Sequence, residues 1–224
     1  MTISAKIIYP GDESPFVAQY FTVHPADPQP RLMRQTAQII GDGGVIAYPT
    51  DSSYALGCRL GDIDAANRMR AIRGVDERHL LTLVCGDLAS AGRFARIDNW
   101  QFRIVRQGVP GPFTFVLAAT REVPRRLVHR KRHTVGIRVP DHPVVRALLA
   151  ELRAPILSTT LMLAGDDVPL HDPDDIRDKL ESKVDLIVDA GPCPDVPTTV
   201  IDLSSEPATI VRLGAGDPAR LGLG

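Results

Sequence analysis

Three arginines stand where apolar segments begin or end, and this position is unusual for a charged side chain. Arg73 ends a segment with helical spacing, Arg138 lies inside the apolar run 135–139, and Arg212 follows two β-branched residues. Because removing an unpaired charge from water is very costly, each arginine needs an anionic partner. The partner is either an internal carboxylate or a bound phosphate or carboxylate, which the planar guanidinium binds in bidentate fashion. Three such arginines favour a shared anion site, gathered around one polar cavity.

Hydroxyl side chains cluster at the ends of three apolar runs. A hydroxyl-rich turn after a buried strand is suited to holding a small polar ligand. The same hydroxyls could instead cap their own backbone, so both interpretations stay open. The clusters are Thr50, Ser52, Ser53 and Tyr54 around Asp51, then Ser158, Thr159 and Thr160, then Thr198 and Thr199.

Several familiar sites are missing from the sequence. It contains no GxSxG, HExxH, GxxxxGK[ST] or GxGxxG motif, which argues against a P-loop or Rossmann nucleotide site. Cys58, Cys85 and Cys193 are too far apart for a CxxC metal site and are expected to be buried thiols. His79 stands between a charged loop and an apolar run, where a surface hydrogen-bonding role is expected.

The segment 121–133 carries six Arg or Lys residues against one Glu. Such a run could bind nucleic-acid phosphates through Arg125, Arg126, Arg130 and Arg132. It could equally be a solvated connection between two strands, since no aromatic residue offers a platform for base stacking.

The pattern of apolar residues predicts an α/β fold. Helical and strand segments alternate up to about residue 188, and strands alone follow, which favours a single domain with a twisted, mixed sheet flanked by helices. Helices are predicted at 31–40, 62–74, 87–95, 99–107, 143–152 and 173–183. Strands are predicted at 45–48, 80–84, 113–118, 134–139, 155–159, 185–188, 198–203 and 209–213.

Composition fits a soluble protein of one large domain. The 224 residues are 44% hydrophobic and 24% charged, with a net charge of −1. No apolar run approaches the roughly 20 residues of a membrane span, and the N-terminus lacks the features of a signal peptide. We therefore expect a cytoplasmic protein with an extension at residues 1–20.

Five motifs occur in the order in which the YrdC-like family, the threonylcarbamoyl-AMP synthases, carries them. YPTDSSYALGC resembles the family's YPT-[DE]-[TS]-x-YGLGC, and TVGIRVPDHP resembles its VxVRxPxHP. PGPFTFVL, PILSTTLMLAG and the pair TTVIDL and IVRLGAG resemble the remaining three. The likeness extends over residues 21–218, which implies one YrdC-like domain, and STTLML is most similar to the YciO-type branch.

The resemblance implies a reaction. In this family, threonine and bicarbonate form a carbamate that attacks the α-phosphate of ATP, giving threonylcarbamoyl-AMP and pyrophosphate. The threonylcarbamoyl group then passes to certain tRNAs with the help of partner proteins. Phosphoryl chemistry of this kind depends on positioning and charge neutralisation, which arginines, hydroxyls and the Mg²⁺ expected with ATP can supply.

The resemblance also assigns roles to individual residues. Arg73 and Arg138 would serve the chemistry directly. The threonine side of the site would comprise Thr50, Tyr54, His79, Arg138 and Thr198. The nucleotide side would comprise Arg73, Thr134, Ser158, Thr160 and Arg212.

The sequence departs from the family pattern at two functional positions. Ala71 stands at the lysine of the family's KxR motif, and Met162 stands at the asparagine of its SxN motif. Each change removes a polar group from the site. Besides the synthase, two alternatives therefore remain: hydrolysis of threonylcarbamoyl-AMP, or binding of double-stranded RNA or tRNA without synthase chemistry.

Overall fold

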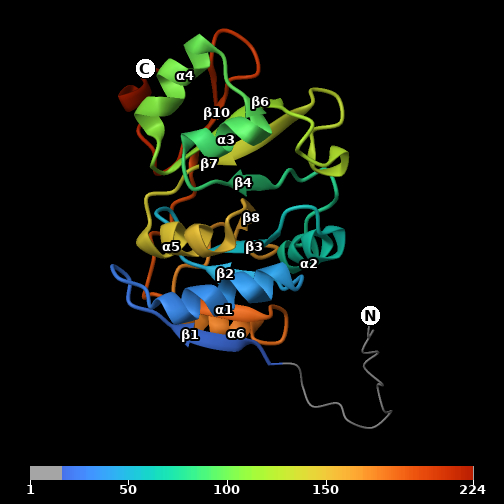
Figure 1. Ribbon diagram of the computed structural model, residues 1–224, viewed down its shortest axis with the longest axis vertical. Helices are drawn as coiled ribbons and strands as arrows, with labels where there is room; N and C mark the ends of the chain where they lie inside the picture. The colour runs from blue at the N-terminus through green and yellow to red at the C-terminus, as the bar shows by residue number, and fades with distance from the viewer. Residues whose placement is uncertain (1–16, 224) are drawn as a thin grey trace.

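The computed structural model describes residues 17–223, in which eleven strands form one mixed sheet with six α-helices (Figure 1). The strands are β1 (Gln19–Thr22), β2 (Ile46–Tyr48), β3 (Ala55–Arg59), β4 (Thr82–Val84), β5 (Ala95–Arg96), β6 (Phe113–Ala119), β7 (Thr134–Arg138), β8 (Ile156–Thr160), β9 (Leu186–Asp189), β10 (Thr199–Asp202) and β11 (Thr209–Arg212). The helices are α1 (Pro30–Gly41), α2 (Ile63–Arg73), α3 (Leu88–Phe94), α4 (Asn99–Gly108), α5 (Pro143–Leu152) and α6 (Pro173–Leu180), with short 3-10 turns at Arg125–Leu127 and Pro218–Leu221.

The sheet runs in the order β1-β9-β2-β3-β8-β4-β7-β6-β10-β11, and β5 pairs with β6. Parallel pairs such as β4 with β7 alternate with antiparallel pairs such as β3 with β8. The predicted α/β fold with a mixed sheet is therefore confirmed. In Figure 1 the sheet twists along the length of the molecule, with α3 and α4 at one end and α1 and α6 at the other.

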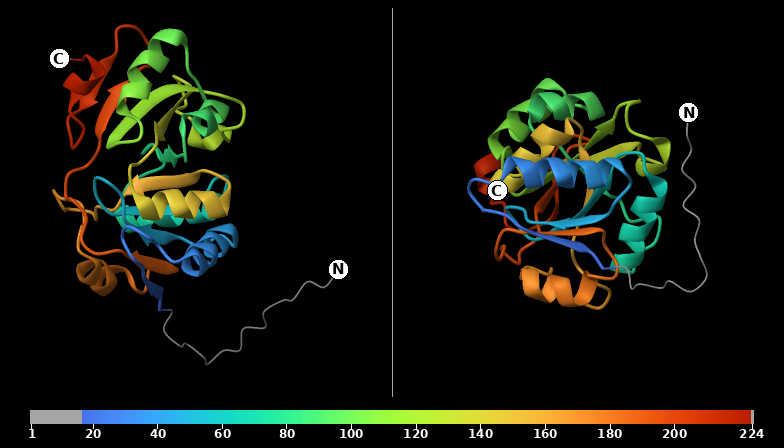
Figure 2. Two further views of the ribbon diagram at one scale, coloured as in Figure 1. Left: turned by 60° about the vertical axis from the view of Figure 1, so that its left-hand side comes forward. Right: turned by 60° about the horizontal axis from the view of Figure 1, so that its bottom comes forward.

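The hydrophobic core has two parts, one on each face of the sheet. Because neighbouring strand residues point to opposite faces, Ile46 belongs to one part and Ala47 to the other. The first part contains the inner sides of α1 and α5, and the second contains those of α2 and α6. The right-hand view of Figure 2 shows strands lying between α1 and α6.

Three strands were not predicted from the sequence. In β3, the first four residues are all buried, so the alternation that marks a half-exposed strand is absent. β5 has only two residues, too few to show any pattern. β1 pairs with β9 and includes Gln19 and Tyr20, which fall within the predicted extension 1–20; residues 1–16 of that extension lie outside the described residues.

Helix boundaries follow the predicted signals closely. The Asp62 side chain accepts a hydrogen bond from the Ala65 amide at 2.9 Å and begins α2. The acidic helix α6 ends at Leu180, before the predicted 183. No helix within residues 17–223 has the length and apolar character that a membrane crossing requires.

Candidate functional site

A cavity of about 300 Å³ lies on one face of the sheet, and alternate residues of five adjacent strands form its floor. Because side chains two residues apart in a strand share a face, each strand contributes a pair to the same surface. The pairs are Ser158 and Thr160 from β8, Thr82 and Val84 from β4, Gly136 and Arg138 from β7, Thr114 and Val116 from β6, and Val200 and Asp202 from β10.

The strand register brings these pairs into one continuous surface. Thr82 lies opposite both Gly136 and Ser158, and Gly136 lies opposite Val116 on its other side. A Cβ added to Gly136 would come within 3.1 Å of the Thr82 hydroxyl. Glycine therefore leaves space at the centre of the floor, where a side chain would crowd Thr82.

Arg73 reaches the cavity from the C-terminal end of α2. Gly74 ends that helix with a left-handed backbone, φ 65°, and a Cβ there would come within 2.6 Å of the Ala164 side chain. Arg73 Nη1 donates to Thr159 Oγ1 at 2.6 Å, and Nε donates to the Met162 carbonyl at 3.3 Å. Arg73 is buried but makes no ion pair among residues 17–223.

His79 supports Arg73 as a neutral acceptor. Arg73 Nη1 lies 2.6 Å from His79 Nε2, and since arginine can only donate, Nε2 must accept. Burial, together with the nearby charge of Arg73, lowers the pKa of His79 to about 4. The imidazole is therefore uncharged at neutral pH and is half-buried, not simply a surface residue.

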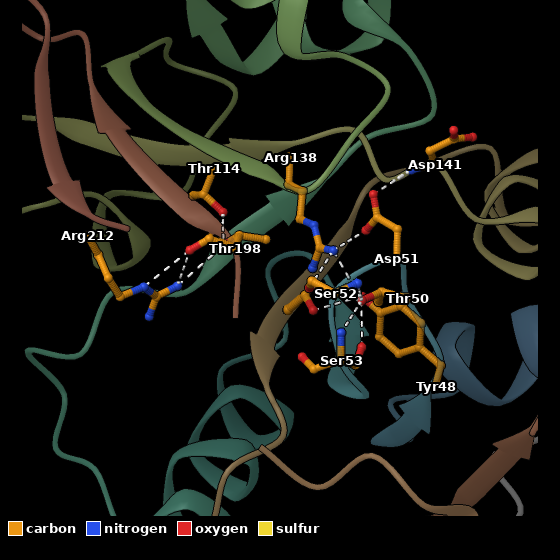
Figure 3. Close-up of polar contacts among 11 residues, drawn as sticks. Tyr48, Thr50, Asp51, Ser52, Ser53, Thr114, Arg138, Asp141, Thr198 and Arg212 are labelled. Atoms are coloured by element: carbon orange, nitrogen blue, oxygen red, sulfur yellow. Dashed lines mark hydrogen bonds and ion pairs between the residues drawn. The ribbon is translucent and has the colours of Figure 1, made fainter. Parts of the chain in front are cut away.

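Arg212 lies at the rim on β11 and is held by Thr198, the residue just before β10. Its Nη2 donates to the Thr198 carbonyl at 2.8 Å and to Thr198 Oγ1 at 3.3 Å (Figure 3). It makes no ion pair among the described residues. Partial burial and the charge of Arg138 lower the pKa of Arg212, and partial burial and the charge of Arg212 lower that of Arg73. The three guanidinium groups thus lie close enough to repel one another.

Arg138 is as enclosed as Arg73, with 7% of the surface of each residue exposed. Its Nη2 forms an ion pair with Asp51 and also donates to Ser52 Oγ at 2.8 Å and to Thr50 Oγ1 at 3.1 Å. Figure 3 shows the guanidinium pointing into the loop that follows β2. Its Nε is buried with no partner among residues 17–223, and no hydrogen bond from Nη1 occurs there. Nη2 is therefore occupied and Nε is sealed from the cavity, which leaves Nη1 for a ligand.

The loop hydroxyls cap their own backbone, which is one of the two roles left open by the sequence, and they also hold Arg138. Thr50 Oγ1 donates to the Ser53 carbonyl at 2.5 Å, which closes the turn on itself. The same oxygen accepts from Arg138, so the turn also orients the guanidinium. Thr50 itself is buried behind Arg138 and does not line the cavity.

The cavity lining includes seven of the ten residues that the resemblance assigned to the threonine and nucleotide sides of the site. They are Arg73, His79, Arg138, Ser158, Thr160, Thr198 and Arg212. Tyr54 lies elsewhere and donates to the Gly191 carbonyl at 2.9 Å. Thr134 shares the face of β7 with Arg138 but is 1% exposed and outside the lining, and its hydroxyl has no partner among the described residues.

The basic run lies beside this cavity. Arg125, Arg126, Arg130 and Arg132 are all exposed. Arg132 lines the cavity and pairs with Asp202 at 2.6 Å, whereas Arg130 lies 3.4 Å from Glu77 near the His79 loop. Two arginines of the run are thus tied to the rim.

Four further residues of the site were given no role from the sequence. Thr114 Oγ1 lies 2.9 Å from Thr198 Oγ1, and Thr159 accepts from Arg73. Asp51 holds Arg138 and Asp202 holds Arg132. All four lie within the quoted motifs, so motif membership was the available signal.

The donor set does not make a resident metal site. Among residues 17–223, no group of three or more His, Cys, Asp or Glu side chains could hold a metal ion. Asp202 is the single carboxylate residue in the cavity lining, and Arg132 already pairs with it.

Comparison with known proteins places the chain in a family. A family model described as "Telomere recombination", named for Sua5, YciO and YrdC, matches residues 38–214. Escherichia coli YciO, named as uncharacterized, is 47% identical over 201 residues, covering 90% of this chain and 98% of that protein. Its crystal structure superposes with a TM-score of 0.88 over 91% of this chain and 99% of that chain.

Two more distant relatives carry functional names. A threonylcarbamoyl-AMP synthase of Hydrogenovibrio crunogenus is 34% identical over 139 residues, covering 60% of this chain and 74% of that protein. The structure of P. abyssi Sua5 complexed with L-threonine has the same fold, with a TM-score of 0.83 at 24% identity over 91% of this chain and 61% of that chain. From the match over residues 38–214 and the close likeness to YciO, we conclude that the chain belongs to the Sua5/YciO/YrdC family, as the motifs had indicated.

Proposed function

We propose that the cavity binds ATP and L-threonine and, with bicarbonate, forms threonylcarbamoyl-AMP. The observation that carries this proposal is the pair Arg73 and Arg212. Both line the cavity, neither makes an ion pair among residues 17–223, and the positive charge of Arg212, after burial, lowers the pKa of Arg73. An anion bound between them would remove that repulsion, and a nucleotide phosphate provides several acceptor oxygens.

The chemistry divides between the three arginines. The amine of threonine joins bicarbonate with loss of water to give a carbamate, whose oxygen attacks the α-phosphate while pyrophosphate leaves. Arg138 would hold the carboxylate or carbamate through its unoccupied Nη1, because Asp51 engages Nη2 alone. Arg73 and Arg212 would take the phosphate charge, and the hydroxyls of Ser158, Thr160 and Thr198 would bind the nucleotide.

The two departures from the family pattern affect the expected rate. Met162 lines the cavity and contributes only its carbonyl, to Arg73. Ala71 is exposed and lies outside the lining. Losing one positioned donor typically costs about 10²–10³-fold in turnover, so we expect synthesis slower than that of a relative with both polar residues.

The test is release of pyrophosphate by the purified chain with ATP, bicarbonate and threonine. Release that requires threonine and falls in Arg212→Gln, but not in the exposed control Arg220→Gln, supports the proposal. If no pyrophosphate appears and added threonylcarbamoyl-AMP is cleaved to AMP, the cavity is hydrolytic. If neither reaction occurs, the enzymatic proposal is wrong.

A second function, binding of double-stranded RNA or tRNA, is favoured by the basic run. Arg125 and Arg126 are exposed and make no ion pair among the described residues, and Arg132 extends the positive surface to the cavity rim. Double-stranded RNA is recognised largely by shape and phosphate charge, for which no aromatic platform is needed. This function is compatible with the first, because tRNA would be the acceptor of the threonylcarbamoyl group.

A further inference from the structure

We propose that the protein has a second ligand site, for a small organic phosphate, in a cavity between α3 and α5. This cavity measures about 390 Å³ and shares no lining residue with the site described above. It lies at the end of β4, where the Cys85 amide donates to the Arg138 carbonyl at 2.8 Å.

The composition of the cavity fits an anion with an apolar body. Its base includes Cys85, Phe94 and Leu149, all buried, together with Pro155. A size of this order suits a small molecule of aromatic or aliphatic character carrying a few polar groups.

Three arginines surround that apolar base. Arg93 and Arg153 make no ion pair among residues 17–223, whereas Arg146 pairs with the exposed Asp141. The Arg93 guanidinium lies 5.8 Å from the centre of the Phe94 ring, which holds it over the apolar floor. One carboxylate in the lining opposes them: Asp87, which is engaged in capping α3 through the Ser90 amide at 2.6 Å.

The charge of the lining favours an anion. Asp141 pairs with Arg146 and Asp87 caps α3, which leaves the guanidinium groups of Arg93 and Arg153 for a ligand, and a phosphate ester carries nearly two negative charges at neutral pH. Guanidinium groups also match the oxygen geometry of phosphate in bidentate fashion.

The backbone of Arg153 gives an independent reason to assign a ligand role. Arg153 caps the C-terminus of α5 with φ 53° and ψ 25°, a left-handed conformation in which glycine is the usual residue. Glycine could form this cap without strain, whereas an arginine here has a steric cost. A strained arginine beside a cavity points to a function of its side chain.

This dual position of Arg153 allows a decisive variant. Arg153→Gly removes the guanidinium and at the same time relieves the backbone. If the side chain has no ligand role, the variant changes only the melting temperature and leaves binding of phosphate esters unaffected. If the side chain binds a ligand, the melting temperature stays the same or rises while binding of the ligand is lost.

The experiment is calorimetric titration of phenyl phosphate, and separately of inorganic phosphate, into the full chain at low ionic strength. We expect saturable binding of phenyl phosphate, tighter than that of inorganic phosphate because the ring covers the apolar base. Arg153→Gly should weaken binding by about tenfold, and adding Arg93→Ala should weaken it further. The control Arg31→Ala with Arg106→Ala removes two exposed arginines elsewhere and should leave affinity unchanged.

A further variant separates this site from the first cavity. Arg212→Gln should leave phenyl phosphate binding unchanged, since Arg212 lines only the first cavity. Loss of binding in Arg212→Gln, equal loss in the control pair, equal affinity for the two phosphates, or no saturable binding at millimolar concentrations would each overturn the proposal. The inference does not depend on the proposed synthase reaction.

Discussion

Asp51 holds Arg138 by one nitrogen, Nη2, and leaves the other side of the guanidinium unpaired. The carboxylate is itself fixed, because its second oxygen accepts from the Asp141 amide at 2.9 Å. Both side chains are nearly enclosed, with 8% of Arg138 and 11% of Asp51 exposed. Asp51 thus fixes the buried guanidinium of Arg138 while pairing with only one of its three nitrogens.

The first prediction concerns the stability that this pair provides. Asp51→Asn leaves the positive charge of Arg138 uncompensated in a buried position, so the free energy of unfolding should fall by about 3 kcal/mol. Urea unfolding measures this change. The control is Asp141→Asn, which breaks the exposed pair with Arg146 and should cost less than about 1 kcal/mol. Equal costs for the two variants would contradict the assignment of Arg138 as a buried, Asp51-dependent charge.

The second prediction separates ligand binding from stability at Arg212. The residue is exposed at the rim and bonds only to Thr198 among the described residues, so Arg212→Gln should change the free energy of unfolding by no more than about 0.5 kcal/mol. The same change removes a charge-assisted contact to phosphate, and affinity for ATP should fall roughly 10- to 100-fold. Thermal shift with ATP and threonine, compared with Arg220→Gln, is the measurement. An unchanged ATP affinity would remove Arg212 from the nucleotide site.

The third prediction is a pH dependence from His79. Its folded-state pKa of about 4 lies below the usual 6.5, so between these values the unfolded chain binds a proton that the folded chain does not. Stability should therefore fall as the pH drops from about 6.5 towards 4, and level off below that. His79→Gln keeps an acceptor for Arg73 and loses the titration.

Comparing the native chain with His79→Gln separates the titration of His79 from that of other groups. One of these is His142, whose pKa is also lowered by burial. The free energy of unfolding of the native chain, minus that of His79→Gln, should decrease as the pH is lowered from about 6.5 to 4. A flat difference would show that the imidazole is not held neutral by its surroundings.

The fourth prediction concerns RNA. If the basic run binds phosphates, the affinity for a short RNA duplex should fall steeply with salt, and the logarithmic slope should lose roughly 0.9 for each contact removed. The variant Arg125→Ala, Arg126→Ala and Arg130→Ala spares Arg132, which holds Asp202 at the cavity. Filter binding over a salt series gives the slope. A slope equal to that of the unaltered chain would exclude this surface as the RNA contact.

Local patterns in the sequence predicted the positions of α2 and β7 and of the arginines that they carry. Helical spacing with an Asp62 cap and a Gly74 stop placed α2 correctly, and therefore the position of Arg73 at its end. The apolar run around Arg138 likewise became β7. These features depend on neighbours a few residues apart, which is the range over which caps and alternation operate.

Contacts across the sheet were beyond that range. Asp51 and Arg138 are 87 residues apart, and nothing local to either distinguishes an ion pair from a ligand site. Thr134 shares the period of Arg138 on β7, yet only the packing of neighbouring segments decides that its hydroxyl is sealed off. Tyr54 bonds to Gly191, 137 positions away, which no pattern around either residue indicated.

The floor formed by alternate residues has a consequence for how this protein can change over evolutionary time. Inserting or deleting one residue within β4, β6, β7, β8 or β10 would rotate every later side chain of that strand to the opposite side. Arg138 or Ser158 would then be buried against helices instead of facing the cavity. Descendants of this chain can vary the lengths of their loops widely, but insertions or deletions within these strands must add or remove an even number of residues.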